Sequence, residues 1–144
     1  MRSTARSLRE STGRTASDGG RPVGVLVVDD SLVFRTGMTR AVQACEGMEL
    51  LGEADGGEAA LRVIAELRPD LVILDLRMPD LDALGVLREL RAQDPPPSCR
   101  VLVISATLDE DGEAEVLAAG ADACLSKALT RAEICAAALR LVAR

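Results

Sequence analysis

VGVLVVDD, at residues 23–30, is a short, valine-rich run that ends in two aspartates. A second run of this kind, DLVILD, occupies residues 70–75 and also ends in aspartate. Similar or weaker runs follow at 48–54, 100–105 and 122–127. Continuous apolar runs of this length are typical of strands buried on both faces, as in parallel sheets. The sequence therefore predicts five buried strands.

Helical patterns separate these runs. The first pattern sets one apolar face from Phe34 to Cys45, through Met38, Ala41 and Val42. Later patterns cover residues 56–68, 81–93, 109–120 and 129–144, with Gly120 expected to end the fourth helix and Thr130 to cap the fifth. Strand and helix thus alternate five times, which predicts an α/β fold: a doubly wound, five-stranded parallel sheet, (βα)5, with helices on both faces.

Charge divides the chain into two parts. Residues 1–21 carry five arginines against two acidic residues, whereas the remainder carries 12 basic and 21 acidic residues, which leaves a net charge of −6. We interpret residues 1–21 as a disordered basic tail and residues 22–144 as one folded domain. The acidic domain would repel phosphates, and no apolar run approaches the roughly 18 residues of a membrane span. Neither a nucleic acid nor a membrane is expected as its partner.

The cysteines and the absence of histidine limit the chemistry. Cys45, Cys99, Cys124 and Cys135 form no C-x-x-C pair, and the 144 residues include no histidine, so we expect no zinc site. Cysteines used in this way are typical of buried apolar positions in a reducing cytoplasm. Without histidine, a Ser-His-Asp triad is excluded.

Polar side chains follow four of the predicted strands. Asp29 and Asp30 follow the first, Asp75 ends the third, Ser105 ends the fourth, and Lys127, the one lysine among 16 arginines, ends the fifth. Each alone has an ordinary explanation, such as a helix cap or a surface charge. Ligands of open parallel sheets bind beyond the carboxyl ends of the strands, so the joint pattern favours a functional site.

The residue types at these strand ends favour phosphoryl transfer. Three aspartates that converge repel one another unless a cation lies among them. Oxygen ligands without histidine or cysteine favour a hard ion, and Mg²⁺ binds one or two carboxylates together with phosphate oxygens. A carboxylate beside Mg²⁺ and a lysine can attack a phosphorus atom while the cations neutralise its oxygens.

The motifs VLVVDDS (25–31), DLVILDLRMPDLD (70–82), VLVIS (101–105) and GADACLSK (120–127) together resemble the receiver domain of bacterial response regulators. The resemblance runs from about Val23 to Val142. It implies the flavodoxin-like strand order 2-1-3-4-5, which we take from the family and do not derive from the residues.

The resemblance also implies a role for each strand-end residue. Asp75 matches the phosphorylated aspartate of the family. Asp30 matches the direct Mg²⁺ ligand and Asp29 the partner that binds the ion mainly through water. Arg77 matches the position whose backbone carbonyl completes the metal shell.

Two further residues match the family's set, and three positions depart from it. Ser105 matches the switch hydroxyl that turns toward the phosphoryl group, and Lys127 matches the lysine that contacts a phosphoryl oxygen. The second switch position, usually an aromatic residue, is Cys124. The usual proline after the lysine, often preceded by a cis bond, is Ala128, so we expect either a costly cis bond or another turn. The glycine after the MPDLD segment is Ala83.

From the resemblance we expect a stand-alone, cytoplasmic response regulator that acts as a phosphorylation-controlled switch. A sensor histidine kinase or a histidine phosphotransfer protein would supply the phosphoryl group. The chain would assist only its own phosphorylation and dephosphorylation and would not otherwise be an enzyme. A target protein, or a second copy of the chain, is expected on the surface of the fourth helix, fifth strand and fifth helix.

Three alternatives remain open at this point. A Mg²⁺-dependent phosphatase would usually carry an Asp-x-Asp pair on its first strand, which VVDDSLV lacks. A nucleotide or flavin binder of this fold would carry a glycine-rich turn after the first strand, and no such turn follows it here. A receiver-like module that works without phosphorylation is compatible with Cys124 and Ala128. For the switch itself, both a diffusible messenger and a phosphate sink in a relay stay open.

Overall fold

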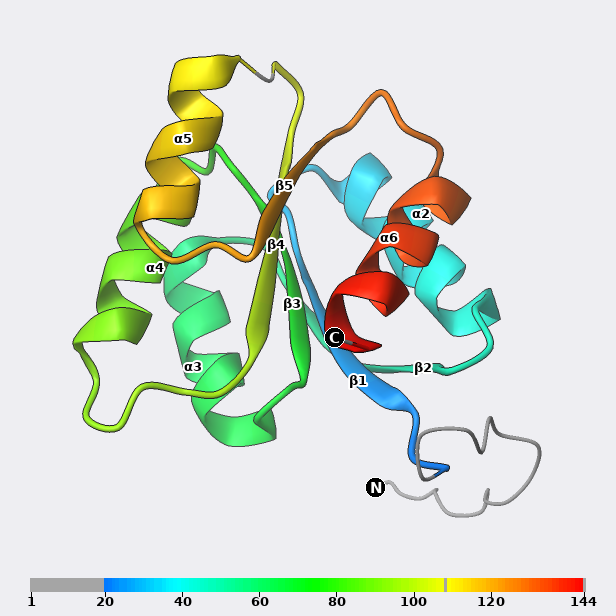
Figure 1. Cartoon of the computed structure of the whole chain (residues 1–144). Helices are drawn as coiled ribbons and strands as arrows, with labels where there is room; N and C mark the ends of the chain where they lie inside the picture. Colours follow the sequence, from blue (N-terminus) through cyan, green and yellow to red (C-terminus); the bar gives the residue numbers. More distant parts are fainter. Residues whose placement is uncertain (1–19, 108, 144) are drawn as a thin grey trace.

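A computed structural model of the chain describes residues 20–107 and 109–143 (Figure 1). Residues 1–19 of the expected basic tail lie outside the described residues. The strands are β1 (Val23–Val28), β2 (Met48–Ala54), β3 (Leu71–Asp75), β4 (Arg100–Ser105) and β5 (Ala123–Ser126). The helices are α2 (Leu32–Ala44), α3 (Gly57–Leu67), α4 (Ala83–Ala92), α5 (Glu110–Ala118) and α6 (Arg131–Ala143). None of the helices in this described part has both the length and the apolar character that crossing a membrane requires.

The five strands form one parallel sheet in the order β2-β1-β3-β4-β5, which confirms the predicted fold and strand order. In the register of the two central strands, Val28 of β1 pairs with Leu74 of β3. The next residues along these strands are Asp29 and Asp75. The sheet register therefore brings two of the predicted acidic residues to the same edge.

Helices cover both faces of the sheet. Figure 1 shows α2 and α6 on one face and α3, α4 and α5 on the other. Successive residues of a strand point to opposite faces, so each strand contributes to two apolar cores. The core under α2 and α6 contains the strand residues Val25, Val27, Leu71, Ile73, Leu102 and Ile104. The core on the other face contains Leu26, Val28, Val72, Leu74, Val101, Val103 and Cys124. This two-sided burial explains why β1, β3 and β4 are continuous apolar runs, whereas β2 and β5 are only partly buried.

The predicted ends of the last two helices are confirmed. Gly120, directly after the C-cap of α5, has a φ of +119°, where glycine is favoured over residues with a Cβ. At the start of α6, the Thr130 hydroxyl accepts a hydrogen bond from the Glu133 amide, and the Glu133 carboxylate accepts one from the Thr130 amide. This reciprocal pair is a capping box.

The loop after Lys127 takes the second of the two conformations that the sequence left open. Among the described residues the cis peptide bond is Asp94–Pro95, so the Lys127–Ala128 bond is trans. The Ala128 amide donates to the Ser126 hydroxyl over 3.0 Å, and the Leu129 amide donates to the Ser126 carbonyl over 3.2 Å. Ser126 thus stabilises a turn that does not require proline.

Candidate functional site

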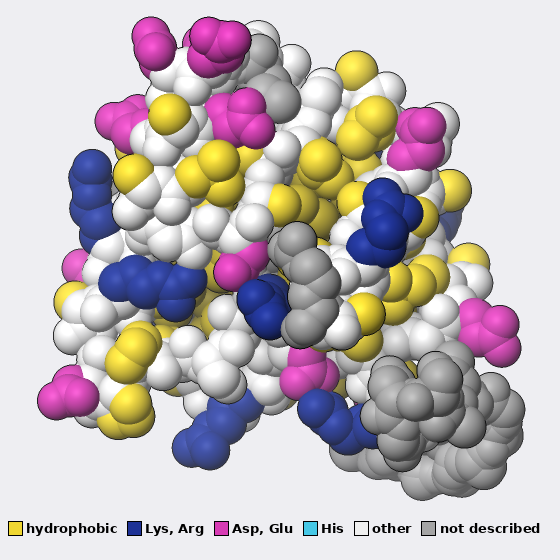
Figure 2. Space-filling model, viewed as in Figure 1, with side chains coloured by type: hydrophobic (Ala, Val, Ile, Leu, Met, Phe, Trp, Pro, Cys, Tyr) yellow, Lys and Arg dark blue, Asp and Glu magenta, His cyan; other side chains and the backbone are white. Residues whose placement is uncertain are grey.

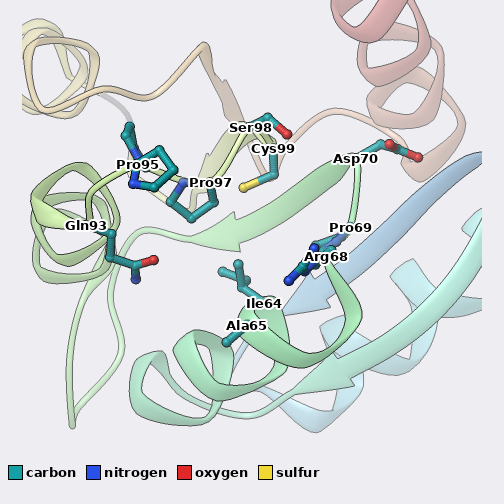
Figure 3. Close-up of a pocket in the computed structure, with 11 residues that line it drawn as sticks. Ile64, Ala65, Arg68, Pro69, Asp70, Gln93, Pro95, Pro97, Ser98 and Cys99 are labelled. Atoms are coloured by element: carbon teal, nitrogen blue, oxygen red, sulfur yellow. The ribbon is translucent and has the colours of Figure 1, made fainter.

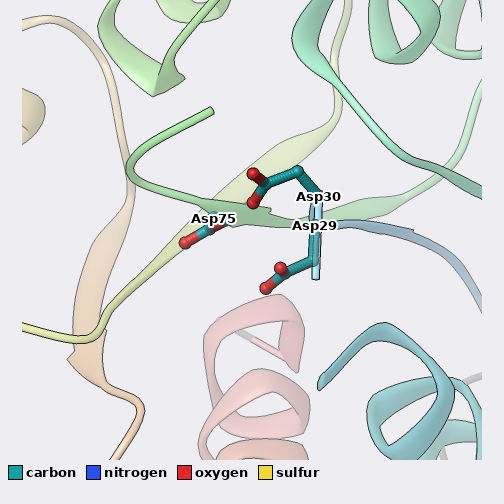
Figure 4. A group of neighbouring side chains, drawn as sticks. All are labelled: Asp29, Asp30 and Asp75. Atoms are coloured by element: carbon teal, nitrogen blue, oxygen red, sulfur yellow. The ribbon is translucent and has the colours of Figure 1, made fainter. Parts of the chain in front are cut away.

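Three carboxylates converge at the carboxyl ends of β1 and β3 (Figure 4). One oxygen from each of Asp29, Asp30 and Asp75 lies within 4.8 Å of the others. Asp29 and Asp75 are only 2% and 6% exposed, whereas Asp30 is exposed. Among the described residues this is the group of acidic side chains placed to hold a metal ion. The predicted convergence of the three aspartates is therefore present in the fold.

Lys127 extends from the end of β5 into this acidic group. Its Nζ lies 2.8 Å from Oδ2 of Asp29 and 3.3 Å from Oδ1 of Asp75. Burial lowers the pKa of Lys127, but the hydrogen bond and charge of Asp29 and the charge of Asp75 outweigh burial and raise it overall. Lys127 therefore remains a cation within the site.

One lysine does not compensate the charge of the buried carboxylates. Burial is the main cause that raises the pKa of Asp75 to about 6, followed by the negative charge of Asp29. The charge and hydrogen bond of Lys127 act in the opposite direction and offset only part of this rise. A second cation would favour the ionised form of Asp75. The uncompensated negative charge of the site therefore suits a metal ion.

The other predicted site residues, Ser105, Arg77 and Cys124, lie on β4, on the loop between β3 and α4, and on β5. Ser105 is buried at the end of β4, where its hydroxyl donates to the Thr107 carbonyl over 3.0 Å and accepts from the Thr107 amide over 3.2 Å. Arg77 is exposed on the loop between β3 and α4. Cys124 is buried on β5 in the core under α3, α4 and α5. The structure therefore does not bring Cys124 to the aspartates.

Two residues that contact the site were not singled out from the sequence. The ring of Phe34, predicted only as part of an apolar helix face, has its centroid 4.4 Å from Nζ of Lys127. Arg35 donates to the backbone carbonyl of Asp29 and to the carboxylate of Glu53, each over 2.8 Å, and so supports the end of β1. The composition did contain a signal for Phe34, because it is the one aromatic residue of the chain.

A cavity of about 490 Å³ lies at the opposite end of the sheet, beside the start of β3 and β4 (Figure 3). It is lined by Ile64, Ala65, Arg68, Pro69, Asp70, Gln93, Pro95, Pro96, Pro97, Ser98 and Cys99. All of these residues lie outside the predicted site. The cavity is therefore separate from the group of aspartates at the carboxyl ends of the strands.

Comparisons with known proteins agree with this geometry. The family model for the response regulator receiver domain matches residues 25–139. The response regulator GacA of Pseudomonas aeruginosa is 37% identical over 106 residues, which cover 73% of this chain and 48% of GacA.

Two solved structures are similar in both fold and sequence. The receiver domain of the NarL regulator from Mycobacterium tuberculosis has a TM-score of 0.80 and 37% identity, and the match covers 85% of this chain and 98% of that one. A chain of the CheX–CheY complex with BeF₃ and Mg²⁺ from Borrelia burgdorferi has a TM-score of 0.72 and 31% identity, and the match covers 87% of this chain and 90% of that one.

The match to the curated relatives concerns one part of their length. This chain spans about half, or less, of the first three of them. The part that matches is the receiver domain, and the matched range includes all of the acidic residues and the lysine of the candidate site. The chain belongs to the response regulator receiver domain family.

Proposed function

We propose that this receiver domain is a phosphorylation-controlled switch in which Asp75 accepts a phosphoryl group in a Mg²⁺-dependent reaction. The observation that carries the proposal is the convergence of Asp29, Asp30 and Asp75 with Lys127 at one edge of the sheet. The donor is a phosphohistidine of a sensor histidine kinase or of a histidine phosphotransfer protein, because this chain has no histidine of its own.

Asp75 is the nucleophile in this proposal. One of its carboxylate oxygens forms the new O–P bond while the N–P bond of the donor breaks, and the bonding electrons stay on the donor nitrogen, which takes up a proton. The reaction requires the ionised form of Asp75. Because its pKa is raised to about 6, the conditions that keep this carboxyl ionised also control its reactivity.

Lys127 and Ser105 stabilise the transferred group. Lys127 already lies beside Asp75, so its ammonium can pair with a phosphoryl oxygen after a small shift. In the unphosphorylated structure the Ser105 hydroxyl donates a hydrogen bond to the Thr107 carbonyl. We expect this hydroxyl to turn toward the phosphoryl group when Asp75 is phosphorylated. Ser105 is then the residue that passes the change from Asp75 to the loop between β4 and α5.

The donor atoms around Asp75 fit Mg²⁺. The site offers three carboxylates within 4.8 Å and no sulfur or imidazole, which is a ligand set for a hard ion. Asp30 and Asp75 would hold the ion, Asp29 would support it through water, and the Arg77 carbonyl would complete the set. Bound Mg²⁺ supplies positive charge that neutralises the phosphoryl oxygens. The Borrelia relative contains Mg²⁺ and BeF₃, which supports this choice.

The surface formed by α5, β5 and α6 is the proposed readout. Ser105 leads into the loop before α5, and Cys124 occupies the second switch position on β5. Figure 2 shows acidic side chains gathered over α5, whose first turn contains Glu110, Asp111 and Glu113. A target protein or a second copy of the chain would bind this surface. Cys124 stands where the family usually has an aromatic ring, so we expect the movement at β5 to differ from that of relatives with a ring there.

Residues 22–144 form the receiver domain in this proposal, and residues 1–21 do not take part in phosphorylation. The exchange takes place in the cytoplasm, a reducing compartment that suits the four free cysteines. The domain catalyses only its own phosphorylation and dephosphorylation. Because the match covers only about half the length of these curated relatives, the proposal concerns the receiver domain alone.

A phosphorylation assay tests the proposal. The chain is incubated with a small phosphodonor, with and without Mg²⁺, and the intact mass is measured for the wild type and for Asp75→Asn. We expect a Mg²⁺-dependent, base-labile phosphoryl adduct on the wild type and none on Asp75→Asn. Glu66→Gln, which changes an exposed carboxylate on α3 to its amide, serves as the matched control and should be modified normally. Equal modification of Asp75→Asn, or an unmodified wild type, would contradict the proposal.

A further inference from the structure

The one aromatic residue and the one lysine of this chain contact each other. Nζ of Lys127 lies 4.4 Å from the centroid of the Phe34 ring, within the roughly 6 Å over which a cation is attracted to a ring face. Phe34 lies in the first turn of α2, four residues after Asp30, and Lys127 follows β5. The contact therefore links the helix that follows β1 to the lysine of the proposed site.

The ring completes a set of three partners around the ammonium. Two of the partners are carboxylates, Asp29 at 2.8 Å and Asp75 at 3.3 Å, and the third is the ring. A lysine side chain has four flexible methylene groups, so a lysine that must meet one phosphoryl oxygen needs restraint. The charge on Asp75 changes when it is phosphorylated, whereas the ring stays neutral and keeps the same interaction with the ammonium before and after the reaction.

A second cationic side chain, that of Arg131, lies over the same ring. The guanidinium carbon of Arg131, the first residue of α6, lies 5.4 Å from the ring centroid. The guanidinium passes over Gly37 of α2, where an added Cβ would lie only 2.3 Å from Nε of Arg131. Glycine inside a helix is less favourable than alanine. The room that Gly37 leaves for Arg131 gives a physical reason for a glycine at this position.

We propose that Phe34 is a positioning residue for Lys127: its ring restrains the ammonium beside Asp75 for phosphoryl transfer, and Arg131 restrains the ring. This inference rests on the proposed function of Asp75. Phe34 acts through Lys127 and touches no reacting atom. The ring is held in turn by α2, whose Met38 and Val42 anchor the helix in the core shared with α6.

The alternative role of Phe34 is that of an ordinary core residue. Its side chain is half-buried and packs against the core under α2 and α6. Leucine would fill most of the same space and lacks only the π-face that attracts a cation. The pair of variants Phe34→Leu and Phe34→Tyr therefore separates the two roles, because tyrosine keeps the ring and leucine keeps only the apolar character.

A spectroscopic test needs no phosphorylation. Because the chain has one lysine, lysine labelled with ¹³C at Cε gives a single side-chain signal. We expect the Hε protons to resonate upfield of their random-coil position in the wild type and in Phe34→Tyr, owing to the ring current. In Phe34→Leu we expect the signal at the random-coil position. An Hε shift that is the same in the wild type and in Phe34→Leu would overturn the contact.

A kinetic test measures the positioning itself. With a small phosphodonor and saturating Mg²⁺, we expect Phe34→Leu to lower the phosphorylation rate constant about 3- to 10-fold, the size of a partly buried cation–π contact. Phe34→Tyr should stay within about 2-fold of the wild type, because its ring attracts the ammonium equally well. The Mg²⁺ concentration that gives half-maximal rate should change little, since the ring touches no carboxylate.

Each outcome decides between the two roles. A wild-type rate in Phe34→Leu, or an equal loss in Phe34→Tyr and Phe34→Leu, would overturn the inference. Val33→Ala, which changes an exposed neighbour of Phe34, is the matched control and should react normally. An unphosphorylated wild type would instead contradict the proposed function, and the lysine signal would still test the contact. Gly37→Ala should displace Arg131 and reproduce part of the loss, even if Phe34→Leu folds poorly.

Discussion

Asp75 is a carboxyl group whose surroundings oppose its own ionisation. Burial and the charge of Asp29 raise its pKa to about 6, so near neutral pH a fraction of the metal-free protein carries a protonated Asp75. The folded state then binds this proton more tightly than the unfolded chain, whose carboxyl has its ordinary pKa of 3.8. Between these two values the stability of the metal-free fold must fall as the pH rises.

The raised pKa of Asp75 predicts how the stability of the metal-free protein depends on pH. In the presence of EDTA, the free energy of unfolding of the wild type should fall by about 1–3 kcal/mol relative to Asp75→Asn between pH 4 and pH 7. Asparagine is neutral throughout, so this comparison isolates the titration of Asp75. Mg²⁺ should restore the loss at pH 7 and have little effect at pH 4. Urea unfolding followed by circular dichroism measures the free energy of unfolding at each pH. If this free energy changed with pH in the same way in the two proteins, the account would be contradicted.

At the residue scale, the sequence predicted the groups at strand ends better than the groups that arrive from elsewhere. Asp29 and Asp75 directly follow apolar runs, and Lys127 follows a shorter one after Ser126, so their convergence needed only the assumption of a parallel sheet. The contact of Phe34 with Lys127 depends on how α2 lies against β5 and α6. Periodicity places Phe34 on the buried side of the helix but does not show which side chain it meets there.

At the scale of elements, the loop after β3 is tied to the start of α3. The N-cap residue of α3 is Gly56, which has no side chain to accept a hydrogen bond. The carboxylate of Asp80 takes this place from 23 residues away, and accepts from the amides of Gly57 and Glu58 over 3.1 Å each. The hydrogen bond from the Glu58 amide, followed by those from the Leu81 and Gly57 amides, holds the pKa of Asp80 below its ordinary value. The cap therefore supports the loop that carries Arg77.

Removal of this cap should weaken the fold. We expect Asp80→Ala to lower the melting temperature by a few degrees, because two amides at the start of α3 lose their acceptor. Glu66→Ala removes an exposed carboxylate from the same helix and should have a smaller effect. Since the pKa of Asp80 is lowered, its contribution is complete above pH 3.8 and is lost as the pH falls below that value. Equal melting temperatures for the two variants would show that Asp80 is not a cap.

The elements themselves could be predicted almost completely, and their arrangement only in part. β1, β3 and β4 were visible as continuous apolar runs, because both faces of the sheet are covered there, whereas β2 and β5 gave weaker runs. Local pattern does not contain the strand order β2-β1-β3-β4-β5, which came from the resemblance to a known family. The cap from Asp80 to α3 was missed for the same reason, because it joins segments that are distant in the sequence.

At the scale of the whole molecule, the contact between Arg21 and Asp70 and the proposed site lie at opposite ends of β3. The Arg21 guanidinium donates to both carboxylate oxygens of Asp70, over 3.1 and 2.9 Å. Asp70 directly precedes β3 and Asp75 ends it, so the two are about 17 Å apart along the strand. Arg21, which the sequence assigned to the tail, therefore contacts the domain at the end remote from Asp75.

Truncation of the N-terminus should separate stability from phosphorylation. Deletion of residues 1–19 keeps the Arg21–Asp70 pair and should leave the unfolding free energy unchanged. Deletion of residues 1–21 removes the pair and should cost less than about 1 kcal/mol, since the arginine is largely exposed. Both truncated proteins should be phosphorylated at the wild-type rate. A slower reaction in either would show that the N-terminal residues take part in phosphoryl transfer.

The most direct test of the central claim is to locate the phosphoryl group on the chain. The wild type is treated with a small phosphodonor and Mg²⁺ and then reduced with borohydride, which converts an aspartyl phosphate into homoserine. The peptides are sequenced by mass spectrometry. We predict homoserine at position 75 only, and aspartate at position 75 when Mg²⁺ or the donor is omitted. Homoserine at position 29 or 30, or an unreduced Asp75 in a chain that carries a phosphoryl group elsewhere, would contradict the account.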